Sequence, residues 1–205
     1  MGRYTGPETT LPVMEIRAAV PAEEQTIGEL VQAAFGLEEG PQVGAVVGAL
    51  QRSGAVRASL VASEPGGAVV GHVQLNRGWL DSRLQLVEVL VLSPLSVAPS
   101  RQRSGIGTAL LRAALKEAAR LGSPAVFLEG APDYYNSRGF AAAGPHGFTA
   151  PSARIPATAF QVALLDSFEP WMSGQLIYPE AFWATDTVGL RDPFLAELEQ
   201  AAEDR

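Results

Sequence analysis

The 205-residue sequence contains no cysteine, and it has two histidines, His72 and His146. The lack of cysteine excludes disulfides, zinc–thiolate sites and a cysteine nucleophile, and two histidines argue against a histidine-based metal site. No apolar run reaches the length of a membrane span, and residues 1–12 lack the charged and then apolar pattern of a signal peptide. We therefore expect a cytoplasmic protein that contacts no membrane and needs no metal.

Basic residues are also scarce, since 15 Lys and Arg stand against 22 Asp and Glu and give a formal net charge of −7. An acidic chain is a poor general ligand for nucleic acids, because binding to a phosphate backbone needs clustered basic side chains. The hydrophobic fraction of 47% and the charged fraction of 18% are typical of a folded globular chain. We expect one full domain with a sizeable core, and no nucleic-acid partner.

Apolar periodicity, glycine and proline divide the chain into strands and helices. Strands are predicted at residues 14–17, 58–63, 69–75, 84–97, 125–129, 158–165 and, less regularly, 175–178. Helices are predicted at residues 21–36, 42–52 and 105–121, with a helical turn at 133–137 and an acidic helix at about 193–204. This order predicts an α+β domain with one β–helix–β crossover. We expect a tail at residues 1–13, the domain at 14–165, and an extension at 166–205 that packs on the same domain.

The long strand at 84–97 is interrupted by Ser93 and Pro94. Proline cannot donate a hydrogen bond to a neighbouring strand, so Pro94 belongs at a bulge or an edge. We expect the second half of the strand, residues 95–97, to diverge from its neighbour and to leave backbone groups unpaired.

A glycine-containing loop at residues 102–107 reads Gln-Arg-Ser-Gly-Ile-Gly and opens directly into a helix. Free backbone N–H groups at the positive end of a helix dipole predict a phosphate site. The P-loop pattern fails because no lysine follows Gly107. A dinucleotide-binding pattern would need a third glycine where Leu110 stands and a shorter loop, although Glu129 imitates its acidic residue. A dinucleotide-dependent oxidoreductase thus remains as a weaker alternative.

Three segments in order resemble the GNAT superfamily of N-acetyltransferases. The loop at 102–107 matches the Gln/Arg-x-x-Gly-x-Gly/Ala pattern of the superfamily's acetyl-CoA site. Residues 93–99 are similar to its Pro-Leu-Ala-Val-x-Pro segment, with Ser96 in place of alanine. Residues 131–140 are similar to the Pro-x-Tyr-Tyr-x-x-x-Gly-Phe element of an uncharacterised bacterial branch. The resemblance covers roughly residues 14–165 and implies a mixed, splayed sheet flanked by helices, with acetyl-CoA as the acyl donor.

The physical properties of these segments suggest how the coenzyme binds. Backbone N–H groups of residues 103–108 can surround the pyrophosphate, and Arg101 or Arg103 can add charge. The freed backbone of residues 95–97 can pair with the amide-bearing pantetheine arm, and an N–H of Leu95 or Ser96 can polarise the thioester carbonyl. The expected coenzyme-binding residues are Leu95, Ser96, Val97, Gln102, Arg103, Ser104, Gly105, Ile106, Gly107 and Thr108.

Two residues are the expected catalytic groups. The resemblance implies that Tyr135 protonates the departing CoA thiolate, and a phenol stays protonated at neutral pH. Tyr134 is expected to be a packing aromatic. Many relatives carry a glutamate base where this chain has Val91, so Glu129 is the better candidate for the base, with Glu88 or a water chain as alternatives.

The expected reaction is transfer of an acetyl group from acetyl-CoA to a primary amine by direct attack. An acyl-enzyme is not expected, because the chain offers no cysteine and no evident Ser/His arrangement. The acceptor can be a small molecule or a peptide, and the sequence is compatible with a homodimer. The main alternative is a non-catalytic module that binds or senses acyl-CoA.

Overall fold

The computed structural model describes residues 14–191, together with residues 194, 195, 197 and 200. The expected tail and most of the expected C-terminal acidic helix lie outside the described residues. Strands lie at β1 Glu15–Ala18, β2 Val56–Ser63, β3 Val69–Ser82, β4 Leu86–Val97, β5 Ala125–Glu129, β6 Ala141–Ala142, β7 Phe148–Thr149, β8 Phe160–Leu164 and β9 Gly174–Ile177. Helices lie at α1 Glu24–Arg52, α2 Ile106–Arg120, α3 Pro132–Tyr135 and α4 Glu180–Ala184. In the described part of the chain, no helix combines the length and apolarity needed to cross a bilayer.

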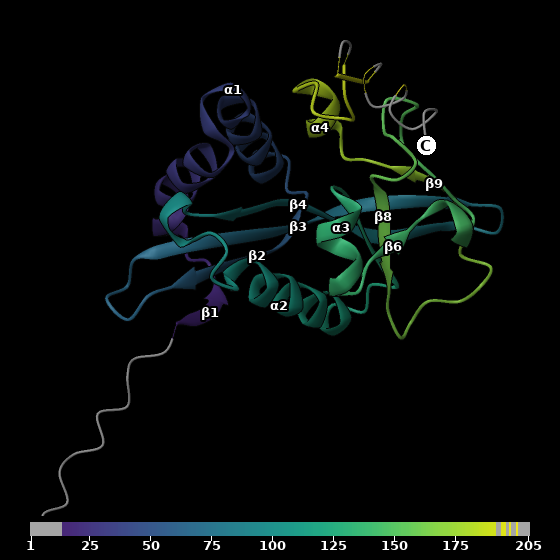
Figure 1. The fold of residues 1–205 in the computed structure, drawn as a ribbon. Coiled ribbons are helices and arrows are strands. Elements are labelled where there is room, and N and C mark those ends of the chain that lie inside the picture. Colours follow the sequence, from purple (N-terminus) through teal and green to yellow (C-terminus); the bar gives the residue numbers. More distant parts are fainter. Residues whose placement is uncertain (1–13, 192–193, 196, 198–199, 201–205) are drawn as a thin grey trace, which may run out of the picture.

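A mixed sheet runs through the molecule in the order β1-β2-β3-β4-β5-β8-β6, and β9 pairs with both β3 and β7 (Figure 1). Most pairs are antiparallel, whereas β4 and β5 are parallel and are joined by the crossover helix α2. This arrangement confirms the predicted α+β class and the β–helix–β unit. The strand β9 comes from the C-terminal extension and pairs with β3 from Trp79↔Ile177 to Ser82↔Gly174, so this part of the extension belongs to the sheet.

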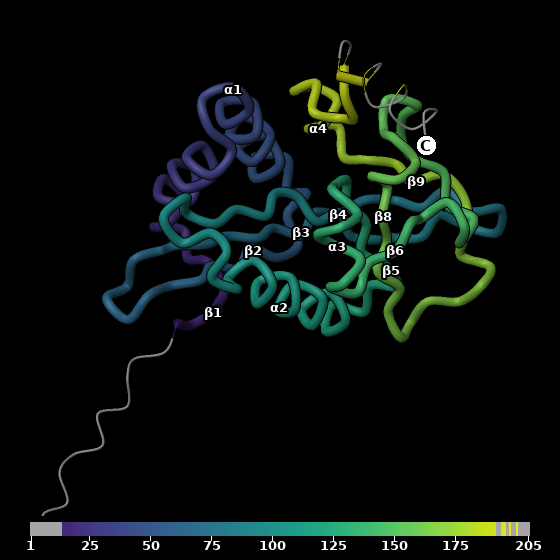
Figure 2. The backbone as a smooth tube through the Cα atoms, viewed as in Figure 1, coloured from purple at the N-terminus to yellow at the C-terminus, as the bar shows by residue number. Residues whose placement is uncertain are grey.

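Helices cover both faces of the sheet, with α1 and α4 on one side and α2 on the other (Figure 2). The helix α2 buries Leu110, Leu111, Ala114 and Ala118, which recur at the spacing of one helical face. These side chains belong to a core cluster that includes Val73, Leu75, Leu90 and Val126 from the sheet. On the opposite face a second cluster joins Val46 and Leu50 of α1 to Phe127, Leu176 and Phe182.

The helix α1 contains the break that separates the two predicted helices. Gly36 has φ 79° and ψ −170°, a backbone conformation that interrupts the helix and that glycine adopts most readily. The second half resumes directly after Gly36, earlier than predicted, and includes Pro41.

The strand β4 diverges from β5 as predicted. The two strands pair only at Leu90↔Val126 and Val91↔Phe127, whereas β4 continues beside β3 as far as Val97↔Gly71. A register shift falls at the predicted interruption, because Leu92 pairs with Leu75 and Leu95 with Val73. The residues of β4 beyond Val91 therefore lack a strand partner on the β5 side, which places an open backbone edge at the middle of the sheet.

A buried side chain fixes this irregularity. The amide nitrogen of Asn76 on β3 donates hydrogen bonds to the carbonyl oxygens of Val91, at 3.3 Å, and of Ser93, at 2.7 Å. Gln74 in turn donates to the side-chain oxygen of Asn76 at 2.7 Å. The two carbonyl groups lie where the strand pairing is irregular, and the Asn76 amide gives each of them a hydrogen-bond donor. Buried polar groups require such partners.

Candidate active site

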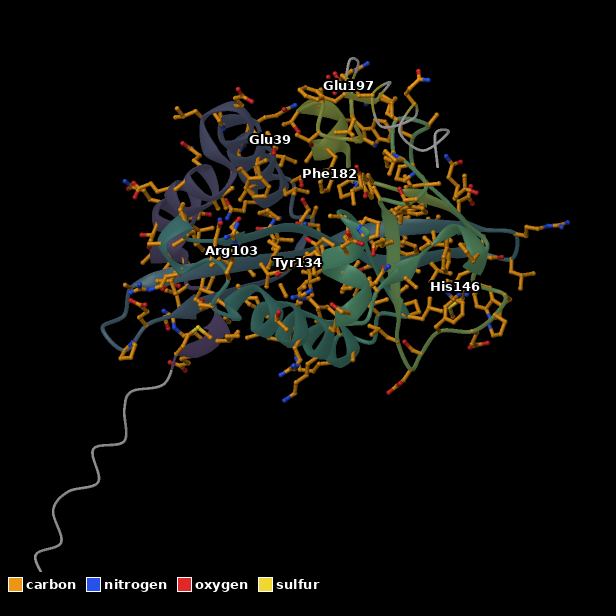
Figure 3. The ribbon with its side chains drawn as sticks, viewed as in Figure 1. Glu39, Arg103, Tyr134, His146, Phe182 and Glu197 are labelled. Carbon is orange, nitrogen blue, oxygen red and sulfur yellow. The ribbon has the colours of Figure 1, made fainter. Side chains whose placement is uncertain are left out.

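A cavity of about 610 Å³ opens where β4, the start of α2 and α3 meet. Figure 3 labels Arg103 and Tyr134 on two of its walls. The lining residues are Leu95, Val97, Gln102, Arg103, Gly105, Gly107, Thr108, Tyr134, Tyr135 and Arg138. Most of the expected coenzyme-binding residues therefore come together around one cavity, which we call the larger cavity.

The start of α2 forms one wall with its backbone. Gly105 precedes the helix in a left-handed conformation with φ 88°, and no side chain caps the helix there. The N–H groups of the first turn, at residues 106–108, have no intrahelical acceptor, and they lie at the positive end of the helix dipole. Arg103 also has a positive φ of 60°, and the Ser104 hydroxyl donates to the carbonyl of Arg101 at 2.5 Å, which tightens the turn. This wall is suited to an anion.

Two cationic side chains line the same cavity, and one of them was missed from the sequence. Arg103 is the predicted one. Arg138 comes from the 3₁₀ turn after α3, where its guanidinium donates to the Thr108 hydroxyl at 2.9 Å and to the carbonyl of Tyr134. It also lies over the Tyr134 ring, 4.0 Å from the ring centre. Its position four residues after Tyr134, on the same helical segment, is the sequence signal that could have found it.

The other expected arginine is engaged elsewhere. Arg101 forms an ion pair with Glu64 of the β2–β3 turn at 2.5 Å and does not line the larger cavity. Of the two arginines considered from the sequence, Arg103 is thus the one that lines the larger cavity.

The Tyr134 side chain lies in close contact with the glycine-containing loop. A Cβ added at Gly107 would lie 2.4 Å from the Tyr134 hydroxyl, so the absence of a side chain at Gly107 permits this approach. Tyr134 is 37% exposed and lines the larger cavity, so the prediction of a packing role leaves out its contact with the loop.

The open edge of β4 forms the opposite wall. Leu95 and Val97 line the larger cavity, whereas the side chain of Ser96 is buried and points away from it. The Gln102 amide donates to the carbonyl of Val97 at 3.3 Å, so one carbonyl of this segment already has a donor. Ser104 and Ile106, also expected to bind the coenzyme, do not line the cavity, and the side chain of Ile106, the first residue of α2, is buried in the core.

A smaller cavity of about 190 Å³ adjoins the larger one, because Leu95 and Tyr135 line both. Its walls come from α1, the β4 bulge, the end of β5 and the C-terminal segment. Its lining residues are Phe35, Val43, Val46, Leu92, Ser93, Pro94, Leu95, Glu129, Tyr135, Phe182 and Thr187. The two expected catalytic residues, Tyr135 and Glu129, therefore border the same small space.

Tyr135 is held by its neighbours. Its ring packs so closely on Gly130 that a Cβ at that glycine would lie 2.3 Å from the ring atom Cε2. Phe140 meets the ring edge-on, with 5.8 Å between ring centres. Burial raises the pKa of Tyr135 to about 12, so the phenol stays protonated across the neutral range.

Glu129 ends β5 and is partly buried. Burial raises the pKa of its carboxyl group, against the lowering effect of hydrogen bonds donated by the Tyr178 hydroxyl and by the backbone N–H of Gly189, the latter at 3.1 Å. The pKa of Tyr178 is itself raised by burial and by the adjacent carboxylate. A desolvated carboxylate binds a proton more strongly than a solvated one, which suits a general base.

The alternative base lies elsewhere. Glu88 pairs with Arg57 at 2.8 Å and lines a separate cavity beside residues 121–123. Val91, at the position of the usual glutamate, is buried in the core.

His72 is buried with its Nε2 atom 2.9 Å from the Ser59 hydroxyl, and burial lowers its pKa to about 4. His72 and Ser59 line neither cavity described above, which agrees with a structural role.

A helix start with free N–H groups, an open strand edge beside it and a half-buried tyrosine where the sheet diverges, together with the mixed sheet, point to the GNAT class. The acetyltransferase (GNAT) family model matches residues 31–148, more than half of the chain, and the chain belongs to this family. Among curated proteins, the uncharacterized N-acetyltransferase YjhQ of Escherichia coli K12 is 33% identical over 86 residues. That segment covers 42% of this chain and 48% of YjhQ, so the match spans about half of that relative.

Solved structures give the same assignment of fold. The GNAT family N-acetyltransferase YhbS from Escherichia coli, in complex with CoA, superimposes with a TM-score of 0.75 at 25% identity, covering 88% of this chain and 96% of that one. A GNAT family acetyltransferase from Brucella melitensis, in complex with acetyl-CoA, gives 0.65 at 29% identity, covering 83% and 98%. The predicted GNAT fold is confirmed.

Proposed function

We propose that this protein is an N-acetyltransferase that moves the acetyl group of acetyl-CoA directly to a primary amine. The observation that carries the proposal is the meeting of two cavities at Leu95 and Tyr135. One of them offers a helix start and two arginines for phosphates, and the other is lined by the partly buried carboxylate of Glu129. A phosphate-bearing donor and an amine can thus approach one point from opposite sides. The CoA and acetyl-CoA complexes of the two structural relatives support this choice of donor.

In the proposed complex, the pyrophosphate lies against the N–H groups at the start of α2, with charge from Arg103 and Arg138. The pantetheine arm then runs along the open edge of β4 and uses backbone groups of residues 95–97 as a strand would. This path brings the thioester toward Tyr135, which lines both cavities.

The chemistry follows from the two titratable groups there. Glu129 accepts one proton from the ammonium group of the acceptor, and the neutral nitrogen attacks the thioester carbonyl carbon. A backbone N–H of Leu95 or Ser96 stabilises the oxyanion. As the C–S bond breaks, Tyr135 donates its proton to the thiolate and regains one from the nitrogen that becomes the amide. The products are the N-acetylated amine, CoA and the proton on Glu129, which passes to solvent.

A single-step transfer agrees with the residues present. The sequence has no cysteine, and the Ser59–His72 pair lies outside both cavities. Holding donor and acceptor in one geometry supplies much of the acceleration that a covalent intermediate would otherwise provide.

The second candidate function is non-catalytic binding of acyl-CoA, and it rests on Val91 replacing the usual glutamate. The substitution Tyr135→Phe tests between the two. If the protein is an enzyme, wild type releases CoA from acetyl-CoA with an amine, and the variant still binds acetyl-CoA but loses about a hundredfold in kcat. The neighbouring Tyr134→Phe should change the KM for acetyl-CoA more than kcat.

Two other results would decide against the proposal. If wild-type protein binds acetyl-CoA but releases CoA with no amine of a diverse panel, the sensing module is correct. If NAD(H) raises the thermal midpoint and CoA does not, the site belongs to a dinucleotide-binding protein.

A further inference from the structure

Most of the residues that line the smaller cavity have apolar side chains, and Ser93, Glu129, Tyr135 and Thr187 add polar groups. Phe35, Val43 and Val46 come from α1, and Phe182 comes from α4 on the other side (Figure 3). At about 190 Å³, the space is below the ~300 Å³ at which drug-sized ligand pockets usually begin. The cavity therefore suits a compact ligand, and its phenylalanine, valine and leucine side chains offer apolar contact to part of that ligand.

Charge in this cavity is limited to one carboxylate. Among the described residues that line it, Glu129 is the sole acidic group, and none is Lys or Arg. An ammonium group can pair with Glu129, but a second ammonium or a carboxylate on the same ligand would lose its hydration without an oppositely charged partner. This arrangement favours one positive charge and disfavours polyamines and free amino acids.

The C-terminal segment completes the cavity and is attached at several points. The Gln42 amide on α1 donates to the carbonyl oxygens of Thr185, at 3.3 Å, and of Asp186, at 2.9 Å. The N–H of Gly189 donates to Glu129 itself. In Figure 1 this segment lies beside α1, above the sheet. Residues 180–189 fall outside the part matched by the family model.

We propose that the smaller cavity is the acceptor site and that its substrate is a compact primary amine with an apolar alkyl or aryl body. The ammonium group lies at Glu129, and the body packs among Phe35, Val43 and Phe182. This inference rests on the proposed function, because it names the acceptor of the same transfer.

The first experiment compares acceptors with the wild-type protein. The apolar set is 3-methylbutylamine, benzylamine and 2-phenylethylamine, and the polar set is spermidine, L-lysine and glucosamine. CoA release gives kcat/KM, and mass spectrometry identifies the N-acetylated product. We expect kcat/KM for the best apolar amine to exceed that for every polar amine by at least about tenfold, since unpaired buried polar groups are strongly rejected.

The second experiment changes the walls. Val43→Phe fills the cavity and should lower kcat/KM for benzylamine at least about tenfold, with the KM for acetyl-CoA unchanged. The matched control is Leu37→Phe on the same helix, where the side chain is 97% exposed. Phe182→Leu enlarges the cavity and should shift the preference toward 3-phenylpropylamine. Its control is Trp183→Leu, the next residue, which is 43% exposed and does not line the cavity.

The outcomes separate the inference from the function on which it rests. Preferred acetylation of a polar amine would overturn the inference and leave the acetyltransferase proposal standing, as would an acceptor profile unchanged in both wall variants. If Val43→Phe does not fold, Phe182→Leu decides alone. Binding of acetyl-CoA without transfer to any amine would overturn the proposed function, and the inference with it.

Discussion

Replacing Gly130 by alanine should slow acetyl transfer by displacing Tyr135. Gly130 follows Glu129 at the end of β5, and its φ is not in the left-handed region, so alanine meets no backbone penalty there. Its new Cβ, however, would lie 2.3, 2.9 and 3.2 Å from three carbons of the Tyr135 ring. The added methyl group should therefore push the Tyr135 ring, and with it the hydroxyl, away from its position in the site.

The size of the displacement follows from these distances. The backbone at Gly130 is fixed, since its N–H donates to the carbonyl of Ala159 at 3.0 Å and its carbonyl accepts from Gln161 at 2.8 Å. Non-bonded carbons prefer about 3.5–4.0 Å, so the ring must move by roughly 1 Å or more. A misplacement of about 1 Å can cost a hundredfold in rate, or about 2.7 kcal/mol in activation free energy.

The assay is CoA release at saturating acetyl-CoA, with the thermal shift induced by CoA as a check on binding. Gly144→Ala is the matched control, because its added Cβ meets nothing within 4 Å and its φ is also outside the left-handed region. We expect full activity in the control, and a large loss of kcat with retained CoA binding in Gly130→Ala.

A double substitution tests whether Tyr135 transmits the effect. If the phenol is displaced, Gly130→Ala should cost little more once Tyr135→Phe has removed the hydroxyl, because coupled positions are not additive. A folded Gly130→Ala protein with kcat within about threefold of wild type would refute the reasoning. So would an undiminished loss in the Tyr135→Phe background.

Three further predictions concern the bulge, the base and the phosphate wall. Asn76→Ala should lower the free energy of unfolding by about 1–3 kcal/mol in thermal or urea denaturation, because it leaves the carbonyl groups of Val91 and Ser93 without donors; an unchanged midpoint would contradict this. Wild-type kcat/KM should rise with pH as Glu129 deprotonates, with a midpoint above the ordinary pKa of glutamate, and a Glu129→Gln profile that kept this rise would exclude Glu129 as its source. Arg103→Ala should raise the KM for acetyl-CoA about tenfold with kcat retained, and it should have no such effect on S-acetylpantetheine, which lacks the pyrophosphate.

The parts of the fold that the sequence predicted are those with local causes. Gly36 causes the break in α1, and Gly105 sets the start of α2. Both glycines adopt a positive φ. The divergence of β4 from β5 was predicted from Pro94, and the register shift falls beside it. In each case one or two residues restrict their own backbone, so neighbouring sequence is enough.

The parts that the sequence did not predict depend on distant partners. The strand β3 was expected to end at Leu75 but continues to Ser82, because β4 and β9 pair with its second half. The short strands β6 and β7 and the helix α4 were not predicted at all. Arg101 forms its ion pair with Glu64, which lies 37 positions away in the sequence. Such pairings depend on the assembled fold, and the residues next to each position in the sequence do not predict them.

The two proposed catalytic groups lie close together in the sequence, which affects how the acceptor specificity of the site can change. Glu129 ends β5 and Tyr135 ends α3, and Gly130 lies in the short connection between these elements, so one continuous stretch of backbone positions the proposed base and acid. The contact between Gly130 and the Tyr135 ring ties them further, and a change to either group would disturb the other. The wall residues on α1 and α4 lie outside this stretch, so a change of their side chains leaves the backbone that carries Glu129 and Tyr135 in place. Divergence in acceptor choice should therefore accumulate at positions such as Val43 and Phe182, while the connection that holds the two proposed catalytic groups stays fixed.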